Sequence, residues 1–143
     1  MGTKKSYLEI NKITERIIGC AYRVSNTLGS GFLEKVYENA FAYELNKAGL
    51  KVSQQYPIQV KYDGVPVGDY IADLIVEDCV LVELKTVNQI DSIHLAHCMN
   101  YLKATSMNIC LLFNFANRRL EFKQIVHNLP EPINEVNTDL SRK

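Results

Sequence analysis

Apolar residues recur with two different periods along the chain, and these periods predict eight elements. Helical spacing over residues 6–29, 32–49 and 88–106 indicates three helices. Ser6 and Glu9 form the pattern of a capping box at the first helix, and Gly29 is a typical end signal. Short apolar runs at 52–62, 65–76, 79–87, 108–115 and 119–127 are typical of strands. The predicted order is α-α-β-β-β-α-β-β.

The first three predicted strands follow one another through short turns, so we expect them to pair antiparallel. Asp63 and Gly64 form a two-residue hairpin turn, and a second turn lies near Glu77 and Asp78. Residues 52–62 alternate between apolar and polar, which predicts a half-buried strand. Residues 79–87 are apolar on both faces, which predicts a central strand.

Charged residues interrupt two of these apolar runs: Asp73 in the first, and Glu83 with Lys85 in the second. Glu83 and Lys85 share a face because strand side chains alternate. A two-residue turn would leave Asp73 on the opposite face, whereas a three-residue turn that includes Cys79 pairs Asp73 with Glu83. A shared site therefore requires an odd turn or a bulge.

A further carboxylate, Glu34, falls on the apolar stripe of the second helix. Carboxylates that meet in a core need a cation or a proton, and oxygen ligands suit Mg²⁺ or Mn²⁺. Asp73 and Glu83 would bind the metal, with Glu34 binding directly or through water. Lys85 would hold the attacking water and stabilise charge on a phosphate. The chemistry that this set suggests is metal-assisted phosphodiester hydrolysis.

Simpler interpretations stay open for each residue taken alone. Glu34 could be a first-turn carboxylate that the helix dipole stabilises, and Glu83 and Lys85 could form an exposed ion pair. Asp73 could cap a loop. Arg118, Arg119 and Lys123 could be a solvated hairpin edge or could contact phosphates.

Composition limits the class of protein. The 143 residues, 47% hydrophobic and 22% charged, suit one folded domain over residues 1–128, with a polar tail at 129–143 that we expect to be frayed. The four cysteines form no CxxC pair, which argues against a disulfide framework or a zinc site. No apolar run is long enough to span a bilayer or to act as a secretory signal, so we expect a cytoplasmic protein without a membrane partner.

Charge is unevenly distributed although the net charge is zero. Residues 52–99 hold two Lys/Arg against seven Asp/Glu, whereas residues 1–51 hold eight against five and residues 100–143 hold six against four. The acidic centre fits a cation site better than a phosphate site, and the basic flanks could hold a phosphate backbone around it.

Two motifs resemble those of a known family. Gly31-Phe-Leu-Glu34-Lys-Val-Tyr37, followed by Asp73 and, after nine residues, Glu83-Leu84-Lys85, resembles the PD-(D/E)XK nuclease-like superfamily and, more narrowly, its GxxExxY proteins. The resemblance covers roughly residues 10 to 127. It implies an α/β (α+β) fold with a restriction-endonuclease-like core, in which helices flank a mixed sheet.

The resemblance also implies roles for individual residues. Glu34, Asp73, Glu83 and Lys85 would be catalytic, and the Leu84 carbonyl would be a further ligand of Mg²⁺ or Mn²⁺. Apart from the resemblance, we expect Tyr37 to be a packing residue whose hydroxyl orients a site carboxylate. His97 stands where relatives usually have a glutamine, which leaves its role open, and Ala72 replaces the proline of the superfamily motif.

The function that follows is a metal-dependent nuclease acting on nucleic acid, with DNA ahead of RNA. A homodimer is expected by analogy with other small nuclease domains. The alternative is a module with the nuclease fold that binds or assembles without catalysis.

Overall fold

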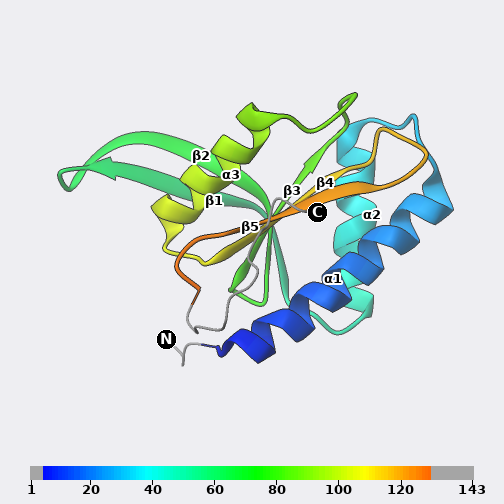
Figure 1. Cartoon of the computed structure of the whole chain (residues 1–143), viewed down its shortest axis with the longest axis horizontal. Coiled ribbons are helices and arrows are strands. Elements are labelled where there is room, and N and C mark those ends of the chain that lie inside the picture. Colours follow the sequence, from blue (N-terminus) through cyan, green and yellow to red (C-terminus); the bar gives the residue numbers. More distant parts are fainter. Residues whose placement is uncertain (1–4, 130–143) are drawn as a thin grey trace.

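The computed structural model of the chain describes residues 5–129 (Figure 1). The predicted tail lies outside the described residues apart from its first position. The element order is the predicted one: α1 (Tyr7–Leu28), α2 (Glu34–Lys47), β1 (Val52–Tyr62), β2 (Val65–Val76), β3 (Val80–Lys85), α3 (Ser92–Thr105), β4 (Ile109–Asn114) and β5 (Glu121–Val126). The predicted capping box is also confirmed, because Ser6 and Glu9 bond each other's backbone N–H groups.

The strands form one mixed sheet in the order β1-β2-β3-β4-β5. The β1–β2, β2–β3 and β4–β5 pairs are antiparallel, and β3 runs parallel to β4. A parallel pair needs a crossover connection, which α3 supplies. The fold class is therefore the predicted one: a mixed sheet flanked by helices, consistent with a restriction-endonuclease-like core.

Helices cover both faces of the sheet (Figure 1). Helices α1 and α2 pack on one face around Phe41 and Phe113, and α3 packs on the other through Cys98 and Leu102. Strands β3 and β4 are buried on both faces, as predicted for the centre of a sheet. The burial of this centre anchors the end of β3, where Glu83 and Lys85 lie.

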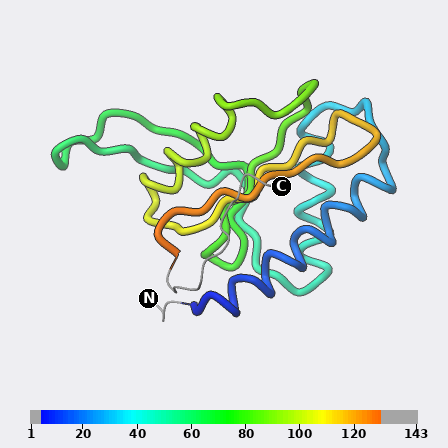
Figure 2. Tube along the Cα trace, in the orientation of Figure 1, coloured from blue at the N-terminus to red at the C-terminus, as the bar shows by residue number. Residues whose placement is uncertain are grey.

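The β1–β2 hairpin forms a long two-stranded ribbon whose far end extends beyond the helices, seen at the left of Figure 2. The prediction of a half-buried β1 is wrong for most of its length, because Ile58 is the buried residue of this strand. Tyr62 and Val65 at the ribbon end are 74% and 57% exposed. The alternation of β1 describes a real strand, but the helices do not reach far enough to cover it.

The side chains of β2 change the face of the sheet on which they lie at Asp73. Residues two apart on a regular strand share a face, yet Ala72 packs in the core beneath α3 whereas Leu74 packs in the core beneath α1 and α2. Opposite this point, Gln55 on β1 has a positive φ of 53°. The register is the same on both sides, with Gln54 paired to Leu74 and Tyr56 paired to Ala72. Gln55 and Asp73 thus mark a kink without a change of register.

No helix within residues 5–129 is long and apolar enough to cross a membrane.

Candidate active site

The turn between β2 and β3 decides whether the predicted charges meet. Glu77 and Asp78 have positive φ values of 53° and 58°, and the Cys79 N–H donates to the Val76 carbonyl at 3.1 Å. Strand pairing resumes at Val76 and Val80, so three residues separate the strands. The three-residue turn, one of the two arrangements considered from sequence, is confirmed. The register that follows places Asp73 opposite Glu83.

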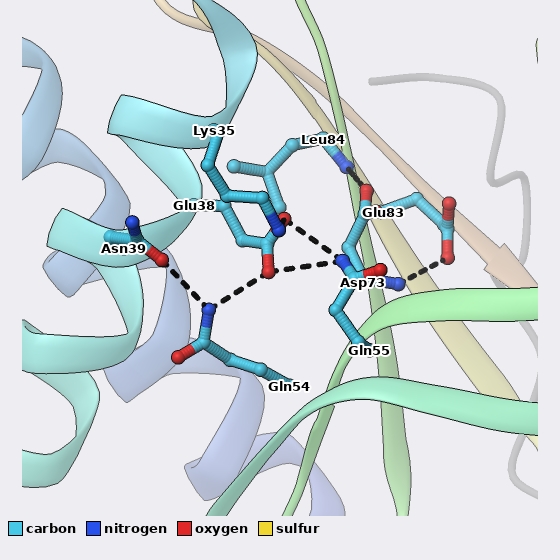
Figure 3. A network of polar contacts seen from close by, with 8 residues as sticks. All are labelled: Lys35, Glu38, Asn39, Gln54, Gln55, Asp73, Glu83 and Leu84. Atoms are coloured by element: carbon cyan, nitrogen blue, oxygen red, sulfur yellow. Dashed lines mark hydrogen bonds and ion pairs between the residues drawn. The ribbon is translucent and has the colours of Figure 1, made fainter.

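Asp73 and Glu83 hold the two strands together just beyond their last regular pair, Leu74 with Val82. The Leu84 N–H donates to Asp73 Oδ2 at 2.8 Å, and the Asp73 N–H donates to Glu83 Oε2 at 3.1 Å (Figure 3). Each carboxylate therefore accepts a backbone N–H of the facing strand. These crossed hydrogen bonds fix both side chains at the point where β2 leaves β3.

Burial makes ionisation of this pair unfavourable. Glu83 is 6% exposed, and burial, with the nearby negative charge of Asp73, raises the pKa of Glu83 to about 8. Burial also raises the pKa of Asp73, against the lowering effect of the Leu84 hydrogen bond. At neutral pH the pair therefore favours a bound proton or a cation close to its oxygens.

Glu34 and Lys85 lie within electrostatic reach of this pair. Glu34 begins α2 and is half-buried; burial, followed by the charge of Asp73, raises its pKa, and Lys85 opposes the shift. Lys85 also lowers the pKa of both Asp73 and Glu83. Among the described residues, no salt bridge joins Glu83 to Lys85. The four charged residues grouped from the sequence therefore do influence one another electrostatically.

A second buried carboxylate, Glu38, was missed from sequence. It lies one helical turn after Glu34 and is 4% exposed. Its oxygens accept hydrogen bonds from Gln54 at 2.8 Å, from Gln55 at 3.0 and 3.1 Å, and from Lys35 at 3.1 Å (Figure 3). Burial raises the pKa of Glu38, but these hydrogen bonds outweigh it and the net shift is downward. Glu38 is thus held as a carboxylate.

The Glu38 network connects α2 to the kink in the ribbon. Gln55, the residue with positive φ opposite Asp73, donates to both Glu38 oxygens. The Glu38 charge in turn raises the pKa of Asp73. The spacing of four residues between Glu34 and Glu38 was the available sequence signal, because residues at i and i+4 share a helix face.

Tyr37 fixes the connection between α1 and α2, which leads into Glu34 at the start of α2. The buried Tyr37 hydroxyl donates to the Gly29 carbonyl at 2.6 Å and accepts from the Phe32 N–H at 3.2 Å. Its ring stacks on Phe115, with 4.9 Å between centroids. The Tyr37 hydroxyl therefore bonds the backbone of the α1–α2 connection. Tyr37 affects the site indirectly, by fixing the connection that leads into Glu34.

His97 is exposed on α3, and its side chain forms no hydrogen bond with another residue that the structure describes. Its neighbour Tyr101, one turn further along α3, is closer to the site. Burial, followed by the charges of Glu83 and, more weakly, Asp73, raises the pKa of Tyr101. The charges of both site carboxylates therefore reach Tyr101.

The donor set suits a hard cation, although the side chains as placed do not surround one. Within residues 5–129, no group of three or more His, Cys, Asp or Glu side chains could hold a metal ion. Asp73 and Glu83 nevertheless provide two carboxylates with raised pKa values, and Mg²⁺ is commonly bound through one or two carboxylates and several waters. The residues present therefore fit such an ion.

Comparison with known proteins agrees with this geometry. The model of the PD-(D/E)XK nuclease superfamily matches residues 11–125, a range that includes Glu34, Asp73, Glu83 and Lys85. The crystal structure of SSO0001 has the same fold, with a TM-score of 0.53 and 18% identity; the match covers 87% of this chain and 60% of that chain. No curated protein matches. With a family match over most of its length, the chain belongs to the PD-(D/E)XK nuclease superfamily.

Proposed function

We propose that the chain is a divalent-metal-dependent nuclease that hydrolyses phosphodiester bonds in nucleic acid. The observation that carries this proposal is the Asp73–Glu83 pair, in which a half-buried and a buried carboxylate face each other across β2 and β3, with Lys85 on the same strand as Glu83. Membership of the superfamily supports the same reaction class. The narrower assignment to the GxxExxY proteins stays a prediction.

The residues that would hold Mg²⁺ or Mn²⁺ are Asp73 and Glu83 through their carboxylates and Leu84 through its carbonyl, with Glu34 bound directly or through water. When bound, the cation supplies a water of lowered pKa as nucleophile and offsets charge on the phosphate. The hydrogen bonds from the Leu84 N–H to Asp73 and from the Asp73 N–H to Glu83 hold one oxygen of each carboxylate, which restricts the positions that these two side chains can take.

Lys85 supplies the positive charge of the site. Its ammonium group would orient the attacking water and stabilise the negative charge that grows on the phosphate. Tyr37 acts at a distance, because its hydroxyl fixes the connection that leads into Glu34. Glu38 and its amide partners would hold the kink at which Asp73 lies.

The test is cleavage of labelled single-stranded and duplex DNA and RNA with Mg²⁺, with Mn²⁺ and with chelator. We expect metal-dependent cleavage that falls on the order of 10²- to 10³-fold in Glu83→Gln and in Lys85→Ala, because each removes a group that acts at the reacting phosphate. Glu15→Gln, an exposed change of the same chemistry on α1, should cleave normally. Equal activity in Glu83→Gln and wild type would contradict the proposal.

The alternative is a module that binds nucleic acid or a protein without cleaving, for which the zero net charge is the supporting observation. Calorimetric titration with Mn²⁺ separates the two functions. A nuclease should bind the ion in a manner that Asp73→Asn abolishes, whereas a module without a metal site should give no heat that depends on Asp73. The preference for DNA and the homodimer stay predictions, to be checked with matched substrates and by sedimentation velocity.

A further inference from the structure

A concave pocket that contains none of the site carboxylates lies between the last turns of α1 and the β4–β5 turn. This pocket has a volume of about 630 Å³ and is lined by Tyr22, Asn26, Asn117, Arg118, Arg119 and Leu120. The lining contains two guanidinium groups, two side-chain amides and an aromatic ring, and it contains no carboxylate. Its chemistry is therefore opposite in charge to that of the acidic centre.

The groups that line this pocket are available to a ligand. Arg118 and Arg119 are exposed, and neither forms a salt bridge with another residue in the described part of the chain. Tyr22 is 41% exposed, and it meets Phe122 edge to face with 6.4 Å between ring centroids. The contact with Phe122 supports the Tyr22 ring while a large part of it stays open to solvent.

The pocket is physically joined to the end of β3. The Phe115 N–H donates to the Lys85 carbonyl at 2.9 Å, and the Asn117 side-chain amide donates to the Asn88 carbonyl at 3.1 Å. Because β3 and β4 are parallel, their carboxyl ends lie at the same edge of the sheet, where the β4–β5 turn begins (Figure 1). The β4–β5 turn that lines the pocket and the end of β3 therefore lie at the same edge of the sheet.

We propose that this pocket binds single-stranded nucleic acid, with Arg118 and Arg119 on backbone phosphates and Tyr22 stacking on a base. The proposal rests on the proposed function, which makes nucleic acid the substrate. Single-strand sites typically combine basic groups that follow the backbone with aromatic rings that stack on bases. A concave pocket that holds an aromatic ring favours a single strand, because the bases of a duplex are already stacked on one another.

Binding in the absence of metal tests this proposal separately from cleavage. The probe is a fluorescein-labelled single strand of roughly 16 nucleotides, the upper end of a one-domain site, and its duplex, both in chelator. Anisotropy is measured over a salt series. For Arg118→Ala/Arg119→Ala we expect a Kd about tenfold weaker and a smaller slope of log K against log salt, lower by about one to two.

Two matched controls sharpen the result. Lys12→Ala/Lys61→Ala removes the same charge from exposed positions on α1 and β1 and should retain nearly normal affinity. Tyr22→Leu keeps an apolar contact with Phe122 but removes the flat ring, so it should weaken binding of the single strand several-fold. Tyr22→Phe, which retains the ring, should bind like wild type.

Several outcomes would overturn the proposal. Unchanged affinity in the arginine pair, an equal loss in the lysine pair, or a loss confined to the duplex would each do so. A lower melting temperature with unchanged affinity would instead assign the arginines to the carboxyl end of α1, whose last turn has no basic residue. If wild type cleaves but either binds no single strand in chelator or loses no affinity in the pocket variants, only the pocket proposal fails. If wild type neither cleaves with metal nor binds, the proposed function fails as well.

Discussion

Glu83 is a buried carboxylate whose ionised form the folded chain disfavours. Its pKa is about 8 in the folded protein, against an ordinary value of 4.5. The folded state therefore binds more protons than the unfolded state between these pH values, and this group's contribution to stability falls as pH rises from about 4.5 to about 8. The shift corresponds to at most about 5 kcal/mol, a figure that Glu83 shares with the coupled Asp73.

The corresponding prediction concerns Glu83→Gln in metal-free protein. This variant should be more stable than wild type at pH 9 and nearly equal to it at pH 4, with a difference on the order of 3 kcal/mol at the alkaline end. Calorimetric unfolding in chelator across this range is the measurement. Glu38 has a lowered pKa and acts in the opposite direction, so the wild-type profile alone is not diagnostic. A constant difference between variant and wild type would contradict the prediction.

Single residues differed in how far the sequence could predict them. Asp73, Glu83 and Lys85 were predicted as site residues because a charge inside an apolar strand is costly to bury unless another group compensates it. Glu38 was missed because its burial depends on Gln54 and Gln55, which belong to a strand outside its own helix. Local periodicity carries no information about such partners, so a satisfied buried carboxylate looks the same as an exposed one.

Among the elements, β1 carries a feature that allows a direct test of backbone strain. Gln55 has a φ of 53°, a region where a residue other than glycine or asparagine typically costs about 1 kcal/mol or more. Gln55→Gly and Gln55→Ala both lose the hydrogen bonds to Glu38, so their difference isolates the backbone. We expect the glycine variant to be more stable by about 1 kcal/mol in chemical denaturation.

The matched control lies two residues earlier on the same strand. Ser53 is not among the residues with positive φ, so Ser53→Ala should be more stable than Ser53→Gly, the reverse of the order at Gln55. If the alanine variant were more stable than the glycine variant at both positions, the kink would store no backbone strain. This result would also weaken the proposal that Glu38 and its amide partners hold the kink at which Asp73 lies.

The number of residues in the β2–β3 turn could not be predicted from the sequence. Side-chain alternation reduced the possibilities to two faces for Asp73, but the pattern at Glu77-Asp78-Cys79 was compatible with a turn of two or three residues. The choice depends on the positive φ values of Glu77 and Asp78 and on the pairing that follows. The half-buried interpretation of β1 failed for a related reason, since burial depends on how far α3 reaches along the ribbon.

In the molecule as a whole, the order of helices and strands and their sheet follow from the periodicity of apolar residues. The charge distribution has a separate consequence for the binding of nucleic acid. The acidic segment 52–99 includes the site carboxylates, whereas Arg118 and Arg119 line a separate pocket. Without a cation, the site should therefore repel the phosphates that the basic pocket attracts. Affinity for nucleic acid should reflect both surfaces at once.

Neutralising the two site carboxylates should then improve metal-free binding. At pH 9, above the Glu83 pKa of about 8, Asp73→Asn/Glu83→Gln removes two negative charges, and it keeps the oxygens that accept the Leu84 and Asp73 N–H groups, so the fold is retained. We expect tighter binding of a labelled single strand, by about tenfold at low salt and less as salt rises, because screening weakens the repulsion. Asp63→Asn/Asp69→Asn makes the same charge change on the exposed ribbon and should have a smaller effect. Equal gains in both double variants would mean that total charge controls binding, whereas a gain specific to Asp73 and Glu83 would place the phosphate path across the site.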